Sequence, residues 1–269
     1  MPEFATDPAD GERQAESLPA MGFLDHLEEL RRRIVYSIIA VAVGFFACWG
    51  YREQIYAVMQ KPIMDALKAN GLSEKLVYLN PTEPFNLYLK IAALAGLFLT
   101  SPFVLYQVWM FISPGLYRNE KRYVVPFMVS TIALFSAGGY FGYKIVYPAA
   151  LNFLIDFGKQ FQPMITIGEY TQLFLSIILG MGLIFEMPIL VFFLALMGII
   201  SAGFMWKNFR YSILVIFIIA AIVTPTTDIL NMCIFAAPMI ALYALSIGVA
   251  WVVHPKQRRA RQEKAKPAQ

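Results

Sequence analysis

Residues 101–122, SPFVLYQVWMFISPGLYRNEKR, contain the transition that decides the fold. The stretch begins in an apolar run that Pro102 is expected to kink, passes an aromatic zone, and leaves through a Ser-Pro-Gly turn at 113–115. The residues after this turn are polar and mostly basic, with Glu120 as their one carboxylate. Aromatic rings succeeded by basic residues are typical of a helix that leaves a bilayer. The stretch therefore predicts the end of a transmembrane helix.

The composition of the chain is that of an integral membrane protein. Hydrophobic residues make up 58% of its 269 residues and charged residues only 15%, far from the balance of a soluble domain. The net charge of +4 comes from basic residues beside apolar runs, which indicates membrane topology and argues against nucleic-acid binding. Cys48 and Cys233 lie in apolar runs without metal-ligand spacing, so we interpret both as small buried hydrophobes.

Six apolar runs predict an all-α polytopic fold with six transmembrane helices. A helix rises about 1.5 Å per residue and a bilayer core is about 30 Å thick, so a span needs about 20 residues, and the fifth run is expected to form a short span. Pro62, Pro102 and Pro188 are expected to be structural, the last two by kinking the helices that contain them. A glycine cluster at 138–142 is expected to permit close helix approach. The expected spans are 34–51, 85–112, 123–147, 171–200, 211–223 and 229–253.

Three regions divide the chain. Residues 1–20 are acidic and poor in large apolar side chains, so a disordered tail is predicted there; they lack the segments of a cleavable signal peptide. Residues 21–253 form the membrane domain, and residues 254–269 form a basic tail. Apolar residues at helical spacing in 21–33 predict an amphipathic helix along the membrane surface. Polar excursions are expected at 52–84 and 148–170.

The basic residues predict the orientation of these spans. The N-terminal region, the loops after the second and fourth spans, and the C-terminal tail hold 15 of the 22 Lys and Arg residues. Loops rich in Lys and Arg stay in the cytoplasm. Both termini are therefore expected to be cytoplasmic, together with Glu29 and Glu120.

Several kinds of chemistry are not expected. His26 and His254 are the only histidines and lie at opposite ends of the chain, so neither a zinc cluster nor a Ser-His protease arrangement is indicated. Glycine-rich phosphate loops are absent as well. We predict no enzymatic activity, no metal and no cofactor.

Three carboxylates stand out by their positions: Glu29 and Glu120 beside membrane ends, and Glu186 within the fourth span. Glu29 has a plain structural interpretation, because Arg32 and Arg33 come after it at i+3 and i+4 on the same helix. Glu28 has the same geometry with Arg32, so spacing alone does not single out Glu29.

Six motifs follow one another along the chain: HLEELRRR (26–33), PTEPFNLYLK (81–90), SPFVLYQVWMF (101–111), PGLYRNEKR (114–122), FEMP (185–188) and TPTTD (224–228). Together they resemble the TatC family, the receptor subunits of the twin-arginine protein translocase. The resemblance implies a concave, glove-like bundle in the cytoplasmic (inner) membrane of a prokaryote. It implies a receptor that binds the twin-arginine signal peptides of folded proteins and exports them, using the proton gradient, with single-span TatA and TatB partners.

The same motifs imply the site residues. The resemblance places four residues on the signal-recognition face: Glu29, Arg31, Phe111 and Glu120. It places Glu186, Thr224 and Asp228 in an intramembrane cavity used for partner docking. A carboxylate suits the first role, because it accepts the forked donors of a guanidinium in a geometry that lysine cannot copy. The chain departs from the family at Met232, where many relatives carry Gln, although Asn231 lies next to it.

The alternative hypothesis is a protein of another class, a proton-coupled small-solute transporter that uses Glu186. Intramembrane carboxylates are common in such transporters, although the chain shows no internal repeat of the kind many of them have. Binding of a twin-arginine signal peptide separates the two hypotheses, because only the receptor should bind it. The oligomeric state, including self-association within the lipid bilayer, stays open.

Overall fold

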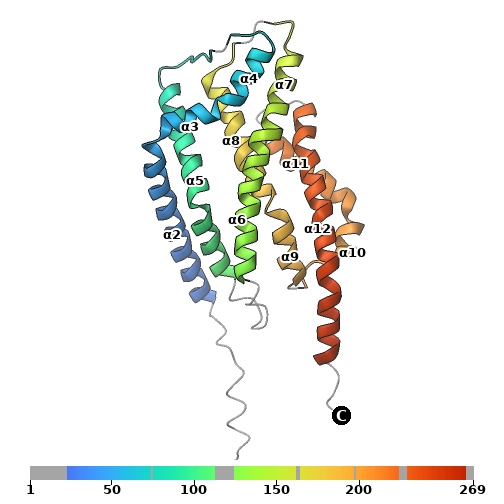
Figure 1. The fold of residues 1–269 in the computed structure, drawn as a ribbon. Coiled ribbons are helices and arrows are strands. Elements are labelled where there is room, and N and C mark those ends of the chain that lie inside the picture. Colours follow the sequence, from blue (N-terminus) through green and yellow to red (C-terminus); the bar gives the residue numbers. More distant parts are fainter. Residues whose placement is uncertain are drawn as a thin grey trace, which may run out of the picture.

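The structure is a computed structural model that describes residues 23–73, 75–112, 124–161, 164–196, 198–223 and 229–264. Within these ranges every regular element is a helix, apart from one isolated parallel bridge between Val77 and Thr166. The predicted all-α class is therefore confirmed. We call the end of the bundle where α2 begins and α12 ends the terminal end, and the opposite end, where α4 and α7 meet, the cap end (Figure 1).

The described helices account for the six expected spans. Four segments are long and apolar enough to cross a membrane: Asp25–Trp49, Glu83–Phe111, Ile167–Leu196 and Met232–Trp251. The third expected span is α6 (Val124–Phe141), which continues through a π-helical turn (Gly142–Val146) into α7 (Tyr147–Phe157). The fifth is α11 (Phe209–Val223), an apolar helix of 15 residues, and it is short as predicted. The remaining bounds are α2 (Phe23–Trp49), α3 (Arg52–Met59), α4 (Lys61–Ala69), α5 (Glu83–Ile112), α8 (Ile167–Ile184), α9 (Met187–Leu196), α10 (Ala202–Lys207) and α12 (Ile229–Lys264).

The helices differ from the expected boundaries at three places. The expected surface helix at 21–33 is not separate, because α2 is one helix from Phe23 to Trp49 and neither Gly nor Pro interrupts it before Gly44. Pro148 does not end the third span; the π-helical turn precedes it, and Pro148 takes an early position in α7, where a missing N–H is tolerated. The last helix runs past the expected end at residue 253 to Lys264. The tail predicted at 1–20 lies outside the described residues.

A tyrosine hydroxyl stabilises the break at Pro62 between α3 and α4. Proline has no N–H, so the carbonyl four residues earlier loses its helical donor. That carbonyl belongs to Val58, and the hydroxyl of Tyr143 donates a hydrogen bond to it at 2.7 Å. The hydroxyl of Tyr170 donates to the next carbonyl, Met59 O, also at 2.7 Å. The cap end is thereby tied to the third and fourth spans.

The two other prolines behave differently from each other. Pro102 lies inside α5, which remains one continuous helix, and the hydroxyl of Ser101 donates to Phe98 O, the carbonyl that Pro102 leaves without a donor, at 2.8 Å. Pro188 coincides with a true interruption, because α8 ends at Ile184 and α9 begins at Met187. The regular helix thus persists at Pro102, whereas beside Pro188 it gives way to a short turn whose backbone is still hydrogen-bonded: Glu186 N donates to Leu183 O and Leu190 N donates to Glu186 O.

Glycines let the helices of two pairs approach each other closely. A Cβ added to Gly96 of α5 would lie 2.6 Å from Phe45 N of α2, and one added to Gly44 would lie 2.7 Å from Gly96 O. A Cβ on Gly138 of α6 would lie 2.5 Å from Met181 O of α8. Small residues at such crossings are how membrane helices maximise contact without a hydrophobic driving force. The close approach expected near Gly138 is therefore confirmed, and the α2–α5 crossing adds a second one.

The buried core has two parts. The larger cluster joins α3, α4 and α7 to α8, α9 and α12, and its fully buried side chains include Tyr147, Ile177 and Phe235. A smaller aromatic cluster at the terminal end contains Trp109 of α5, Phe127 of α6 and Phe193 of α9. Cys48 is buried as predicted, whereas Cys233 is exposed on the outside of the bundle.

We predict that Gly96→Ala destabilises the protein by about 1 to 3 kcal/mol, because the new methyl group overlaps the backbone of α2. Thermal unfolding in detergent should show a lower midpoint than the wild type. Gly248→Ala is the matched control, since a Cβ at Gly248 meets nothing within 4 Å and Ala favours a helix. Equal midpoints for Gly96→Ala and the wild type would show that the crossing is not tight.

Candidate functional site

Charged residues cover the first turns of α2 at the terminal end. Glu28, Arg31 and Arg32 are exposed, whereas Glu29 and Arg33 are partly buried. Glu29 and Arg33 are one helical turn apart, so they share one face of α2, and that face packs along α5. The sequence therefore places two opposite charges on the side of α2 that meets another helix.

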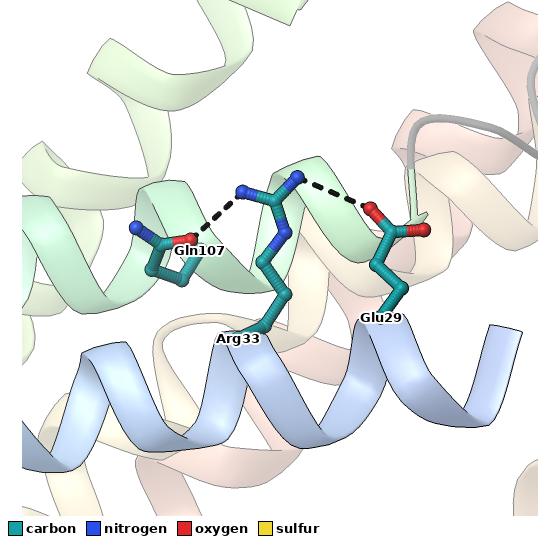
Figure 2. A network of polar contacts seen from close by, with 3 residues as sticks. All are labelled: Glu29, Arg33 and Gln107. Atoms are coloured by element: carbon teal, nitrogen blue, oxygen red, sulfur yellow. Dashed lines mark hydrogen bonds and ion pairs between the residues drawn. The ribbon is translucent and has the colours of Figure 1, made fainter. Parts of the chain in front are cut away.

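Arg33 joins Glu29 to a residue of α5 (Figure 2). Its Nη2 donates to Glu29 Oε1 at 3.1 Å, and its Nη1 donates to Gln107 Oε1 at 2.9 Å. The side chains of Arg33 and Glu29 retain 16% and 10% of their exposure, so the ion pair is largely withdrawn from solvent. One carboxylate oxygen, Glu29 Oε2, and the guanidinium Nε of Arg33 are buried without a hydrogen-bond partner. The network is therefore only half satisfied.

An aromatic contact lies on the same side of α2. The ring of His26 stacks on the ring of Phe111 of α5, with centroids 4.4 Å apart and planes at 13°. We call His26, Glu29, Arg33, Gln107 and Phe111 together the α2–α5 seam. A groove of about 560 Å³ runs beside it, lined by Asp25, Glu28, Glu29, Arg31, Arg32, Val35 and Tyr36.

The seam brings together some of the predicted site residues and adds others. Glu29 and Phe111 lie in the seam, and Arg31 lines the groove beside it. The structural interpretation of Glu29, an ion pair with Arg33, is also correct. Gln107 and the stacking of His26 were not predicted, although a polar side chain within the apolar run 103–111 was a visible signal. Glu120, Thr224 and Asp228 lie outside the described residues.

Glu186 occupies the interruption between α8 and α9. It comes directly after Phe185, whose side chain packs against Gly138 and Phe141 of α6. Its Oε1 is buried without a hydrogen-bond partner, and no ion pair reaches it from the described residues. The described contacts do not join Glu186 to the seam, so Glu29 and Glu186 are two separate places, within the described residues, where a buried carboxylate oxygen has no hydrogen-bond partner.

Metal chemistry has no basis in the described ranges. They contain no group of three or more His, Cys, Asp or Glu residues that is arranged to hold an ion. The seam itself offers hydrogen-bonding groups, and a carboxylate such as Glu29 pairs well with the forked donors of a guanidinium.

Six apolar spans with a polar seam at one end define a polytopic α-helical membrane protein. The family model of the Sec-independent protein translocase protein (TatC) matches residues 25–238. The chain therefore belongs to the TatC family, the receptor subunits of the twin-arginine translocase, and is a transport component and not an enzyme.

Individual relatives agree along nearly the whole chain. The TatC protein of Koribacter versatilis is 68% identical over 264 residues, which covers 98% of this chain and 97% of that protein. The TatC protein of Carboxydothermus hydrogenoformans is 38% identical, with 88% of this chain and 96% of that protein covered. A crystal structure of the twin arginine translocase receptor TatC has a TM-score of 0.75 at 34% identity and covers 84% of this chain and 97% of that one. The fold is thus that of TatC, a multi-pass bacterial membrane protein.

Proposed function

We propose that the α2–α5 seam is where this TatC protein receives the paired arginines of a signal peptide. The observation that carries the proposal is the free oxygen of Glu29, which lies in a half-satisfied ion pair beside the groove. A buried acceptor without a donor favours any arrangement that supplies one. An incoming guanidinium supplies several donors in a fixed fork.

Two carboxylates would accept the two arginines, Glu29 in the seam and Glu120 in the loop after α5. Hydrogen bonds to charged groups contribute about 1.5 to 3 kcal/mol each, which is enough for a specific, reversible complex. A lysine carries the same charge but not the planar fork, so geometry alone discriminates against Lys-Lys. Arg31 at the groove and Phe111 in the seam complete the proposed recognition face.

The remaining parts of the proposal concern orientation and partners. We propose that both termini are cytoplasmic, with residues 1–20 and 254–269 as tails of the membrane domain 21–253. Single-span partners of the TatA and TatB kind would complete the translocase, and the proton gradient would drive export. Glu186 is assigned to partner docking together with Thr224 and Asp228, because its unpaired oxygen lies in a helix break within the membrane span.

Replacing Glu29 with Gln is expected to weaken binding of a twin-arginine signal peptide by about 1 to 3 kcal/mol, because the charge-assisted hydrogen bond is lost. Fluorescence anisotropy with a labelled peptide and the purified full-length protein measures this affinity. Glu53→Gln is the matched control: it removes the same charge from an ion pair with Arg52 in α3, away from the groove beside the seam. Glu120→Gln should behave like Glu29→Gln. Unchanged affinity in the Glu29→Gln, Glu120→Gln double variant would refute the assignment.

Single-cysteine labelling tests the proposed orientation, once Cys48 and Cys233 have been replaced. Cysteines at Ala69 and Lys159 should react with an impermeant reagent applied from outside the cell. Cysteines at Arg118 and Lys207 should react only after the membrane is opened, because loops rich in basic residues stay in the cytoplasm. Labelling of Arg118 from outside would reverse the orientation and remove the proposed docking face.

Substitutions at Glu186 separate partner docking from signal recognition. We expect Glu186→Ala to bind the signal peptide normally and to lose export, since Glu186 has no described contact with the seam. Glu186→Gln should largely preserve export, because no cation pairs with this carboxylate in the described residues and an amide retains its hydrogen-bonding shape. Measurements of peptide affinity and of cargo export for each variant distinguish a role in partner docking from one in signal recognition. Full export by Glu186→Ala would remove the functional role, and joint loss of binding and export would make the residue structural.

A further inference from the structure

Arg33 gives Glu29 the same chemical group that a signal arginine would give it. One fork of its guanidinium lies 3.1 Å from Glu29 Oε1, in a pair that is shielded from solvent. An arginine of the peptide must therefore compete with Arg33 for the Glu29 carboxylate. When the carboxylate turns to the peptide, the buried charge of Arg33 needs another acceptor, since an unpaired buried charge is strongly unfavourable.

Gln107 is already placed as that acceptor. Its Oε1 lies 2.9 Å from Nη1 of Arg33, on the fork that does not face Glu29, and Gln107 comes from a different helix (Figure 2). Only 5% of Gln107 is exposed, so this side chain cannot be expected to contact a peptide in the groove. Any influence of Gln107 on binding must then pass through Arg33.

From this arrangement we propose that Gln107 and Arg33 are positioning residues that set the affinity of Glu29 for an arginine ligand. Arg33 holds Glu29 in the ligand-free protein, and Gln107 retains Arg33 when Glu29 engages the ligand. The inference rests on the proposed function and adds to it a resident competitor for the carboxylate. The two unpartnered atoms, Glu29 Oε2 and Arg33 Nε, fit this exchange, because a fully satisfied network would resist rearrangement.

The exchange predicts opposite effects for two substitutions of one residue. Gln107→Leu leaves Arg33 with Glu29 as its acceptor, so the peptide competes less well and its affinity falls about five-fold, the effect of one ordinary hydrogen bond. Gln107→Glu draws Arg33 away with a charge-assisted bond, so Glu29 is released and the affinity rises by about as much. A purely structural role for Gln107 would make both substitutions harmful.

A double-mutant cycle in the full-length protein tests the inference. The probe is a synthetic peptide with two adjacent arginines and a C-terminal apolar segment, and its Kd is measured for each Gln107 variant with Glu29 and with Glu29→Gln. We expect the effects of Gln107→Leu and Gln107→Glu to disappear in the Glu29→Gln background, because coupled residues are not additive. If the carboxylate of Gln107→Glu simply attracts the basic peptide, the gain in affinity would persist in the Glu29→Gln background. That result would overturn the inference.

Two further comparisons make the outcomes separable. Ser101→Ala is a control for general damage to α5. The buried hydroxyl of Ser101 donates a hydrogen bond to the carbonyl of Phe98, so its removal should lower the stability of the protein while the Kd of the peptide stays unchanged. If Glu29→Gln weakens binding but Gln107 changes nothing, or acts equally in both backgrounds, the positioning role is wrong and the proposed site stands. If Glu29→Gln alone leaves Kd unchanged, the proposed site itself is wrong and the positioning role falls with it.

Discussion

The fold depends on one constraint, that backbone polar groups inside a bilayer have no water to bond with. Each proline in a spanning or capping helix removes a donor and leaves one carbonyl without a partner. Side-chain hydroxyl groups replace the missing donors in two places. The hydroxyl of Tyr143 donates to the carbonyl of Val58 at the cap end, and that of Ser101 donates to the carbonyl of Phe98 in the middle of α5. Because Tyr143 belongs to a different segment from Val58, satisfying a local defect also joins distant parts of the chain.

The α2–α5 seam contrasts with this satisfied backbone. There the unpaired atoms belong to side chains, a carboxylate oxygen and a guanidinium nitrogen, at the terminal end of the bundle. The helices that carry them are held close by glycines, and the proposed recognition requires only that the side chains exchange partners. Rigid helices with an incompletely satisfied polar network are a suitable arrangement for reversible recognition.

Much of this architecture could be predicted from the sequence, because hydropathy and basic loops report directly on the membrane. Such signals predict the six spans and the short α11, and they predict a kink at Pro188, beside which α8 ends and α9 begins. Contacts between distant segments are not predicted in this way. Nothing in the sequence around Gln107 indicates that its Oε1 lies 2.9 Å from Nη1 of Arg33, because 74 residues separate the two. Pro148 was misjudged because a π-helical turn, which no composition rule indicates, lets the helix continue. The pairing of Glu29 with Arg33 was foreseeable from i+4 spacing, but its missing second partner was not.

The crossing at Gly44 and Gly96 has a mechanical meaning. Backbone lies against backbone there, and neither glycine leaves room for a side chain, so α2 and α5 are packed in direct contact at this crossing. The outer face of α2 presents large apolar side chains to its surroundings, among them Ile38, Val43 and Phe46. A helix of another subunit that packed on this face would press on α2 and α5 together. Through Trp109 of α5, the same contact would reach Phe127 of α6 and Phe193 of α9.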